Sequence, residues 1–220
     1  MIVMRKLLWL LLLVAVIGPL QEIDAQNKLK QKTVVSKNGD KYVGTVYKKR
    51  DRFTGKKKFV KTGEGKMYYA DGSIFEGKWE SDFPSVGTYK TGSGDVFKGV
   101  FRNGGFFSGR CEYTSGDVFE GTVAGQGRPI PVNGLYKYKN GDVFEGKFWE
   151  GIPEEGTKTF AAAGDILIGG NRWSYPASCR FEGRIDSWSG LFDCPLKNTK
   201  GDTFEAVSYT HLRAHETCAD

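Results

Sequence analysis

The stretch NGDVFEGKFWEG, residues 140–151, joins a turn dipeptide, an aromatic residue, an acidic residue and further glycines in one short phrase. From Gly141 onward it follows the six-residue pattern Gly-(Asp/Ser)-X-aromatic-X-Gly, in which X is any residue. Five copies of this pattern begin at Gly39, Gly72, Gly94, Gly116 and Gly141, and a weaker one begins at Gly164 with Leu167 in the aromatic position. After a first gap of 33 residues the copies start 22 to 25 residues apart, which is typical of a structural array.

Each copy predicts a β-hairpin. Gly-Asp pairs favour tight turns because glycine accepts positive φ and aspartate hydrogen-bonds nearby backbone, and the alternation in VFEGKF suits a half-buried strand. One hairpin buries too little surface to be stable, whereas stacked hairpins shield one another's rings. The expected ring column is Tyr42, Phe75, Phe97, Phe119, Phe144, Phe181 and Phe204. We expect an all-β, elongated, single-layer antiparallel sheet of stacked β-hairpins, with the glycine two places after each ring leaving room for the neighbouring unit.

Three segments carry a family resemblance: YADGSIFEGKWE, YTSGDVFEGTV and YKNGDVFEGKFWEG resemble MORN repeats. The resemblance extends over residues 35–205 and is closest over 72–151. Residues 152–200 depart from the pattern through an insertion near 165–178, around NRWSYPAS. The resemblance implies a scaffolding, membrane-associating or self-associating module, sometimes appended to an enzyme. A fold-level likeness supplies no reaction of its own.

The N-terminus is predicted to be a signal peptide over residues 1–25. Arg5 and Lys6 precede an apolar run over residues 7–17, which is too short to cross a bilayer as a helix and typical of a secretory signal. Ile23-Asp24-Ala25 before Gln26 offers a cleavage site, and an uncleaved N-terminal anchor is the alternative. We therefore expect an exported protein that is periplasmic, extracellular or associated with an outer surface.

The C-terminus departs from the repeat at Ala206, within a last copy over residues 201–206 that ends in mid-unit. The segment VSYTHLRAHET, residues 207–217, resembles a translated sequencing-library adapter. We expect residues 207–220 to be a disordered artefact, the repeat domain to span 26–206, and the natural chain to continue further. A natural tail is the alternative. The only histidines of the chain, His211 and His215, lie in this segment with Cys218, so no metal site is expected there.

Without histidine, acid–base chemistry is left to carboxylates, lysines or tyrosines. The recurring acids are Asp95, Asp117, Asp142, Asp165 and Asp202 at turns, and Glu76, Glu120, Glu145, Glu182 and Glu205 on strands. Paired carboxylates serve glycoside hydrolysis, but residues that follow the repeat period suit turn capping and cross-strand pairing with Lys78, Lys147 or Arg184. The acids also lack the spacing of calcium loops. We expect no catalytic residue, no metal and no cofactor.

The cysteines suggest one disulfide. In CRFEGRIDSWSGLFDC, pairing Phe181 opposite Phe192 also sets Cys179 opposite Cys194, which brings the two within disulfide range. Two buried free thiols are the alternative, and Cys111 is left unpaired.

Charge is concentrated near the N-terminus. Residues 26–66 hold fourteen Lys and Arg against three acids, a net +11, whereas 67–206 sum to −4. The candidate anionic-surface residues are Lys48, Lys49, Arg50, Arg52, Lys56, Lys57, Lys58 and Lys61. Such a cluster attracts anionic lipid headgroups or an envelope polymer, and a solvated loop is the alternative. No nucleic-acid partner is expected, because no binding motif accompanies the charge.

These observations predict a non-catalytic binding or scaffold module that associates with a membrane surface, an envelope polymer, a protein partner or another copy of itself. One alternative is the targeting section of an enzyme whose catalytic domain lies beyond residue 206. Another is a carbohydrate-binding module that uses exposed Trp79, Trp149 and Trp188, unless these tryptophans fill the core.

Overall fold

The computed structural model describes residues 28–168, 170–185 and 188–204, and within these ranges the chain contains strands and no helix. The predicted signal peptide and the adapter-like tail lie outside the described residues. The strands are β1 (Lys30–Val35), β2 (Lys41–Arg50), β3 (Lys57–Tyr68), β4 (Ile74–Glu80), β5 (Phe83–Lys90), β6 (Val96–Arg102), β7 (Gly105–Glu112), β8 (Val118–Ala124), β9 (Ile130–Lys137), β10 (Val143–Trp149), β11 (Ile152–Thr159), β12 (Gly164–Ile168), β13 (Asn171–Tyr175), β14 (Arg180–Arg184), β15 (Ser189–Phe192), β16 (Leu196–Asn198) and β17 (Thr203–Phe204).

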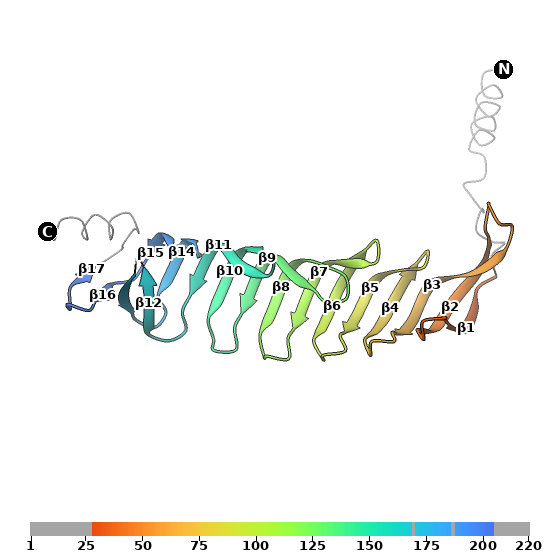
Figure 1. The fold of residues 1–220 in the computed structure, drawn as a ribbon, viewed down its shortest axis with the longest axis horizontal. Helices are drawn as coiled ribbons and strands as arrows, with labels where there is room; N and C mark the ends of the chain where they lie inside the picture. Colours follow the sequence, from red (N-terminus) through yellow and green to blue (C-terminus); the bar gives the residue numbers. More distant parts are fainter. Residues whose placement is uncertain (1–27, 169, 186–187, 205–220) are drawn as a thin grey trace, which may run out of the picture.

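Thirteen strands form one long antiparallel sheet in chain order from β1 to β11, followed by β14 and β15. Figure 1 shows them as successive rungs of an elongated, twisted ladder that does not close on itself. Strands β12, β13, β16 and β17 form a second, four-stranded sheet at the end opposite the N-terminus. The predicted elongated all-β architecture is confirmed.

The turn that recurs between hairpins has one geometry. Between β5 and β6 the Thr91 amide donates to the Asp95 carbonyl at 2.9 Å, and the Gly94 amide donates to the Thr91 carbonyl at 3.0 Å. The same two bonds recur at residues 36–40, 69–73, 113–117, 138–142 and 198–202. Gly94 has φ +102°, a conformation that costs glycine little and other residues much, which explains why the repeat keeps a glycine here.

The turn aspartates also connect one hairpin to the next. Asp117 Oδ1 accepts from the Lys139 amide at 2.7 Å, and Asp142 Oδ1 accepts from the Ala161 amide at 2.9 Å. Asp40 and Asp95 accept in the same way from the amides of Ala70 and Thr114. Capping of turns by these acids was expected, but the acceptor serves the following turn of the array, so it stabilises the stacking of units.

Replacing Asp142 by alanine is expected to lower the free energy of unfolding by about 2 kcal/mol, because a charged acceptor of a backbone amide is lost. The substitution Asp142→Asn keeps an oxygen acceptor and should cost less. Urea unfolding followed by circular dichroism measures both. Equal losses in Asp142→Ala and Asp142→Asn would contradict the role of this acceptor.

The core is a double row of side chains on one face of the sheet. The first six predicted ring residues, from Tyr42 to Phe181, are at most 2% exposed, and the side chain of Phe204 lies outside the described set. Four positions after a ring, a second apolar residue follows a β-bulge. These are Val46, Trp79, Phe101, Val123 and Phe148, all buried. Edge-to-face contacts, such as Phe97 with Phe101 at 5.2 Å, join the two rows.

Glycines form an unbroken row across the main sheet from β2 to β15, here named the glycine ladder. Each member is the Cα partner of the next: Gly44, Gly65, Gly77, Gly87, Gly99, Gly109, Gly121, Gly134, Gly146, Gly156, Gly183 and Gly190. The rings lie against this row. A Cβ on Gly99 would lie 2.7 Å from both the Gly109 Cα and the Phe97 Cζ. These glycines leave room for the second strand and the ring of their own hairpin, as Gly99 of β6 does for Gly109 of β7, so the expectation that they make room for a neighbouring unit is wrong.

The weak sixth copy at Gly164 was wrongly assigned to the repeat. Strands β12 and β13 pair with each other in the second sheet, and β11 pairs directly with β14. Side-chain alternation buries Ile166 and Ile168, so Leu167 is 64% exposed and no ring occupies its place. The array skips this insertion and continues with Phe181.

The second core holds the disulfide. Phe181 pairs with Phe192 in the expected register, and Cys179 is bonded to Cys194 with their Cα atoms 5.3 Å apart. The bond lies among Phe160, Trp173 and Leu196, between the two sheets. Cys111 is buried and is not disulfide-bonded.

Candidate functional site

The β2–β3 hairpin is longer than its neighbours. Its strands have 10 and 12 residues, against 7 or 8 in β4 to β11, and its end projects past the row of hairpins (Figure 1). Asp51 holds the connecting loop, because its Oδ1 accepts from the amides of Thr54 at 2.8 Å and Phe53 at 3.0 Å. These bonds, led by that from Thr54, lower the pKa of Asp51 below its ordinary value.

Seven of the eight candidate basic residues are exposed, all but Lys61, and six of these seven lie at the projecting end. They are Lys48, Lys49, Arg50, Arg52, Lys56 and Lys57, here named the basic tip. Two pairs of like charge face each other across the strands, Arg50 opposite Lys57 and Lys49 opposite Lys58. Like charges directly opposite one another destabilise a sheet. The hairpin therefore carries an electrostatic cost that a bound anion would remove.

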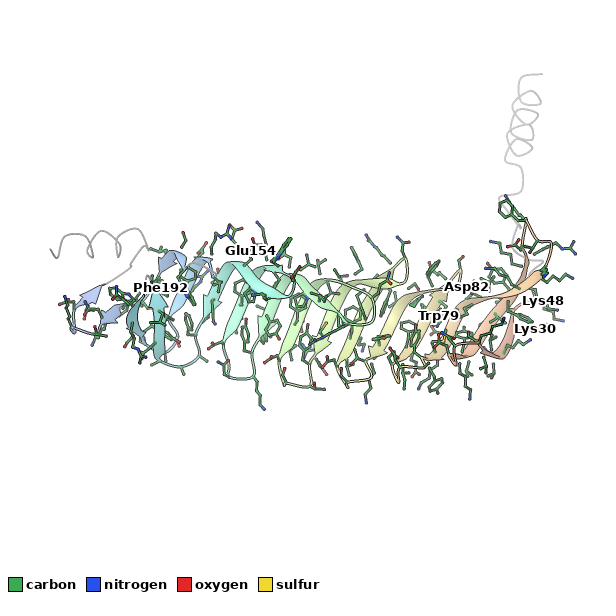
Figure 2. The ribbon with its side chains drawn as sticks, viewed as in Figure 1. Lys30, Lys48, Trp79, Asp82, Glu154 and Phe192 are labelled. Carbon is green, nitrogen blue, oxygen red and sulfur yellow. A yellow bond between two sulfur atoms is a disulfide. The ribbon has the colours of Figure 1, made fainter. Side chains whose placement is uncertain are left out.

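The other two candidates serve the junction with the next hairpin. Lys58 Nζ lies 3.4 Å from Asp82 Oδ2, and the Lys61 amide donates to Asp82 Oδ1 at 2.8 Å. The Lys61 ammonium sits over the Trp79 ring, 4.5 Å from its centroid, and burial lowers the pKa of Lys61. Figure 2 places Asp82 and Trp79 beside this hairpin. Lys58 and Lys61 are therefore less available to an external anion than the basic tip.

Phe53, within the loop that joins β2 to β3, was missed by sequence reasoning. Its side chain is 99% exposed, although large rings elsewhere in the array are mostly buried. The sequence contained an indication of this exposure, because Phe53 does not occupy a ring position of the repeat and follows directly after Arg52. An exposed ring among cations is the composition that favours the interface of a membrane.

The tryptophans do not form one exposed surface. Trp79 is 2% exposed and packs edge-to-face on Phe75 and Tyr42. Trp188 is half-buried against Phe181, and Trp149 is 68% exposed. The carbohydrate site built on all three is therefore wrong, since Trp79 belongs to the core.

The strand glutamates form surface ion pairs. Glu76 pairs with Lys66 at 2.9 Å and Glu120 with Arg110, which are not the expected bases, while Lys147 pairs at 2.9 Å with Glu155, a glutamate outside the recurring set. Such exposed pairs contribute little to stability individually. Among the described residues there is no group of three or more His, Cys, Asp and Glu side chains arranged to hold a metal ion.

Within the described part of the chain, no helix is long and apolar enough to cross a membrane. Comparison with known proteins adds no assignment: no protein-family model matches the chain, and no curated protein is significantly similar to it.

Proposed function

We propose that this chain is a non-catalytic binding module of the MORN type whose β2–β3 hairpin docks on an anionic lipid surface. The observation that carries the proposal is the basic tip, in which like charges face each other beside the fully exposed ring of Phe53. Stability alone gives no reason to retain this arrangement.

The energetics favour a lipid surface. Each cation near an anionic leaflet contributes about 1 kcal/mol, so several together hold the hairpin at the headgroups. Insertion of the Phe53 ring adds roughly 1.5–3 kcal/mol of apolar burial. The stacked hairpins behind the tip then act as a rigid arm that extends from the surface.

Co-sedimentation with phosphatidylserine–phosphatidylcholine vesicles tests the proposal. The triple variant Lys49→Glu, Lys56→Glu, Lys57→Glu is expected to abolish binding, and Phe53→Ser to weaken it about tenfold, which corresponds to about 1.4 kcal/mol. Vesicles of phosphatidylcholine alone should bind weakly, because the attraction is electrostatic.

A second triple variant with the same change in net charge is the control. Lys90, Lys98 and Lys137 are exposed on the array away from the basic tip, and their replacement by glutamate should leave binding intact. If both triple variants lost vesicle binding equally, binding would depend on net charge alone, and the docking role of the hairpin would be refuted. An unmodified chain that ignores anionic vesicles but sediments with an acidic polysaccharide would replace the lipid surface by an envelope polymer.

A further inference from the structure

Among the four hairpins from β4 to β11, one differs from the others in its connection. The links β4–β5, β6–β7 and β10–β11 each have two residues, whereas β8 and β9 are joined by five, residues 125–129. In the same hairpin Val123 occupies the second core row, where Trp79, Phe101 and Phe148 place rings. A smaller side chain and a longer loop together leave space on the ring face of the sheet.

That space is an open groove of about 560 Å³. It is lined from one side by the turns around Asp95 and Asp117, and from the other by residues 128–129 of the long loop, by residues 130–131 at the start of β9 and by Glu150. The two ends of the hairpins therefore approach each other across the ring face. The volume lies within the range of about 300–1,000 Å³ that holds small ligands in proteins.

The polar side of the groove is held in place. Asp95 is 4% exposed, and its Oδ1 accepts from the amide and hydroxyl of Thr114 at 2.8 and 3.1 Å. Its Oδ2 lies 3.8 Å from Nε of Arg128, a side chain that is 71% exposed. Asp117 Oδ2 accepts from the hydroxyls of Ser115 at 2.9 Å and Tyr136 at 3.1 Å. Burial raises the pKa of Asp117, but these two hydrogen bonds and the one from the Lys139 amide outweigh burial. The pKa of Asp117 therefore lies below its ordinary value.

Two tyrosines supply the aromatic part of the lining, beside Pro129, Ile130 and Pro131. The rings of Tyr113 and Tyr136 are nearly parallel, at 21° with centroids 5.8 Å apart, and both line the groove. Burial raises the pKa of the Tyr136 hydroxyl, and Asp117 raises it further, so it stays a neutral donor to that carboxylate. Each ring joins an apolar face to a polar end.

From this combination we infer that the groove binds a neutral saccharide. Carboxylates accept hydrogen bonds from sugar hydroxyls, an exposed guanidinium donates to sugar oxygens, and the C–H face of a pyranose packs on aromatic rings. Arg128 offsets part of the negative charge of Asp95, which disfavours a simple cation as ligand beside that carboxylate. The site is separate from the basic tip and does not depend on the proposed docking at lipid.

Titration of the isotope-labelled chain with cellobiose, maltose and N,N′-diacetylchitobiose, followed by amide NMR, tests the inference. At least one disaccharide should shift the amides of Thr114 and Lys139, which donate to the two groove carboxylates. Asp95→Asn and Arg128→Ala should each weaken that binding at least tenfold, about 1.4 kcal/mol. The absence of shifts with all three sugars would overturn the inference.

The matched control is Arg172→Ala. Arg172 is likewise an exposed arginine in an ion pair with an aspartate, Asp165 at 3.4 Å, but it lies on the second sheet. It should leave saccharide affinity unchanged. Thermal unfolding shows whether the Asp95→Asn variant still folds. If that variant does not fold, Arg128→Ala tests the site, because Arg128 lies in an exposed loop. Equal affinity for the sugar in wild type and Arg128→Ala would refute the site.

Discussion

Replacing Phe97 by alanine is expected to lower the free energy of unfolding by about 4 kcal/mol. The ring is fully buried and meets Phe101 on its own strand and Phe106 on the next, with centroids 5.2 and 5.0 Å away. Truncation removes its burial and leaves a cavity that the flanking strands cannot fill, and Phe→Ala changes in cores cost about 3–5 kcal/mol. In a repeat array this loss of stability affects one unit and its interfaces with the two neighbouring units.

Urea unfolding of three variants separates this effect from a general loss of aromatic area. Phe97→Leu keeps most of the volume and should cost less than half as much as Phe97→Ala. Trp149→Ala removes a larger ring that is 68% exposed, and should change stability by about 0.5 kcal/mol or less. If Phe97→Ala were no more destabilising than Trp149→Ala, the buried ring column would not be the source of stability.

Replacing Gly109 by alanine is expected to destabilise the chain by about 3 kcal/mol, although it adds a single methyl group. A Cβ at this position would lie 2.7 Å from the Gly99 Cα and 3.0 Å from the Lys98 carbonyl carbon. Both obstacles are backbone atoms of the facing strand, so no rotamer change relieves the overlap, and the two strands must separate. Overpacking of this kind costs about 1–3 kcal/mol, and rigid surroundings favour the upper end.

The same substitution at Gly105 is a control within the same strand, β7. There the nearest atom to an added Cβ is the Gly125 carbonyl oxygen at 3.2 Å, in an irregular loop, and the next is at 3.7 Å. Gly105→Ala should therefore cost about 1 kcal/mol or less. Thermal and urea unfolding compare the two variants. Similar midpoints for both would show that the close strand approach at the glycine ladder does not limit which residues fit.

Local chemistry made much of the fold predictable. The turn around Gly94, the buried ring of Phe97 and the glycine at position 99 follow from the residues of one unit. The bond between Cys179 and Cys194 followed from the strand register, because antiparallel partners have constant index sums. The reach of Asp117 to the next turn depends on how successive hairpins lie against each other, and no single unit encodes that.

The candidate sites were less accessible to such reasoning. Lys57 and Lys58 are adjacent in one basic run, but in the fold Lys57 lies opposite Arg50 whereas Lys58 pairs with Asp82. At the copy around Gly164 the pattern was misleading, because it matched the glycine and the acid but not the ring that stacking requires. The groove beside Asp95 involves Arg128, 33 positions later in the chain, so its parts share no motif.

The acceptors that join successive turns give assembly of the array a direction. Asp40, Asp95, Asp117 and Asp142 each receive the backbone amide of a residue 19 to 30 positions later. During synthesis the N-terminal end emerges first, so at these four turns the acceptor oxygen is already part of the preceding hairpin when the next one forms. Folding can then advance together with translation, each completed rung serving as the template for the one that follows.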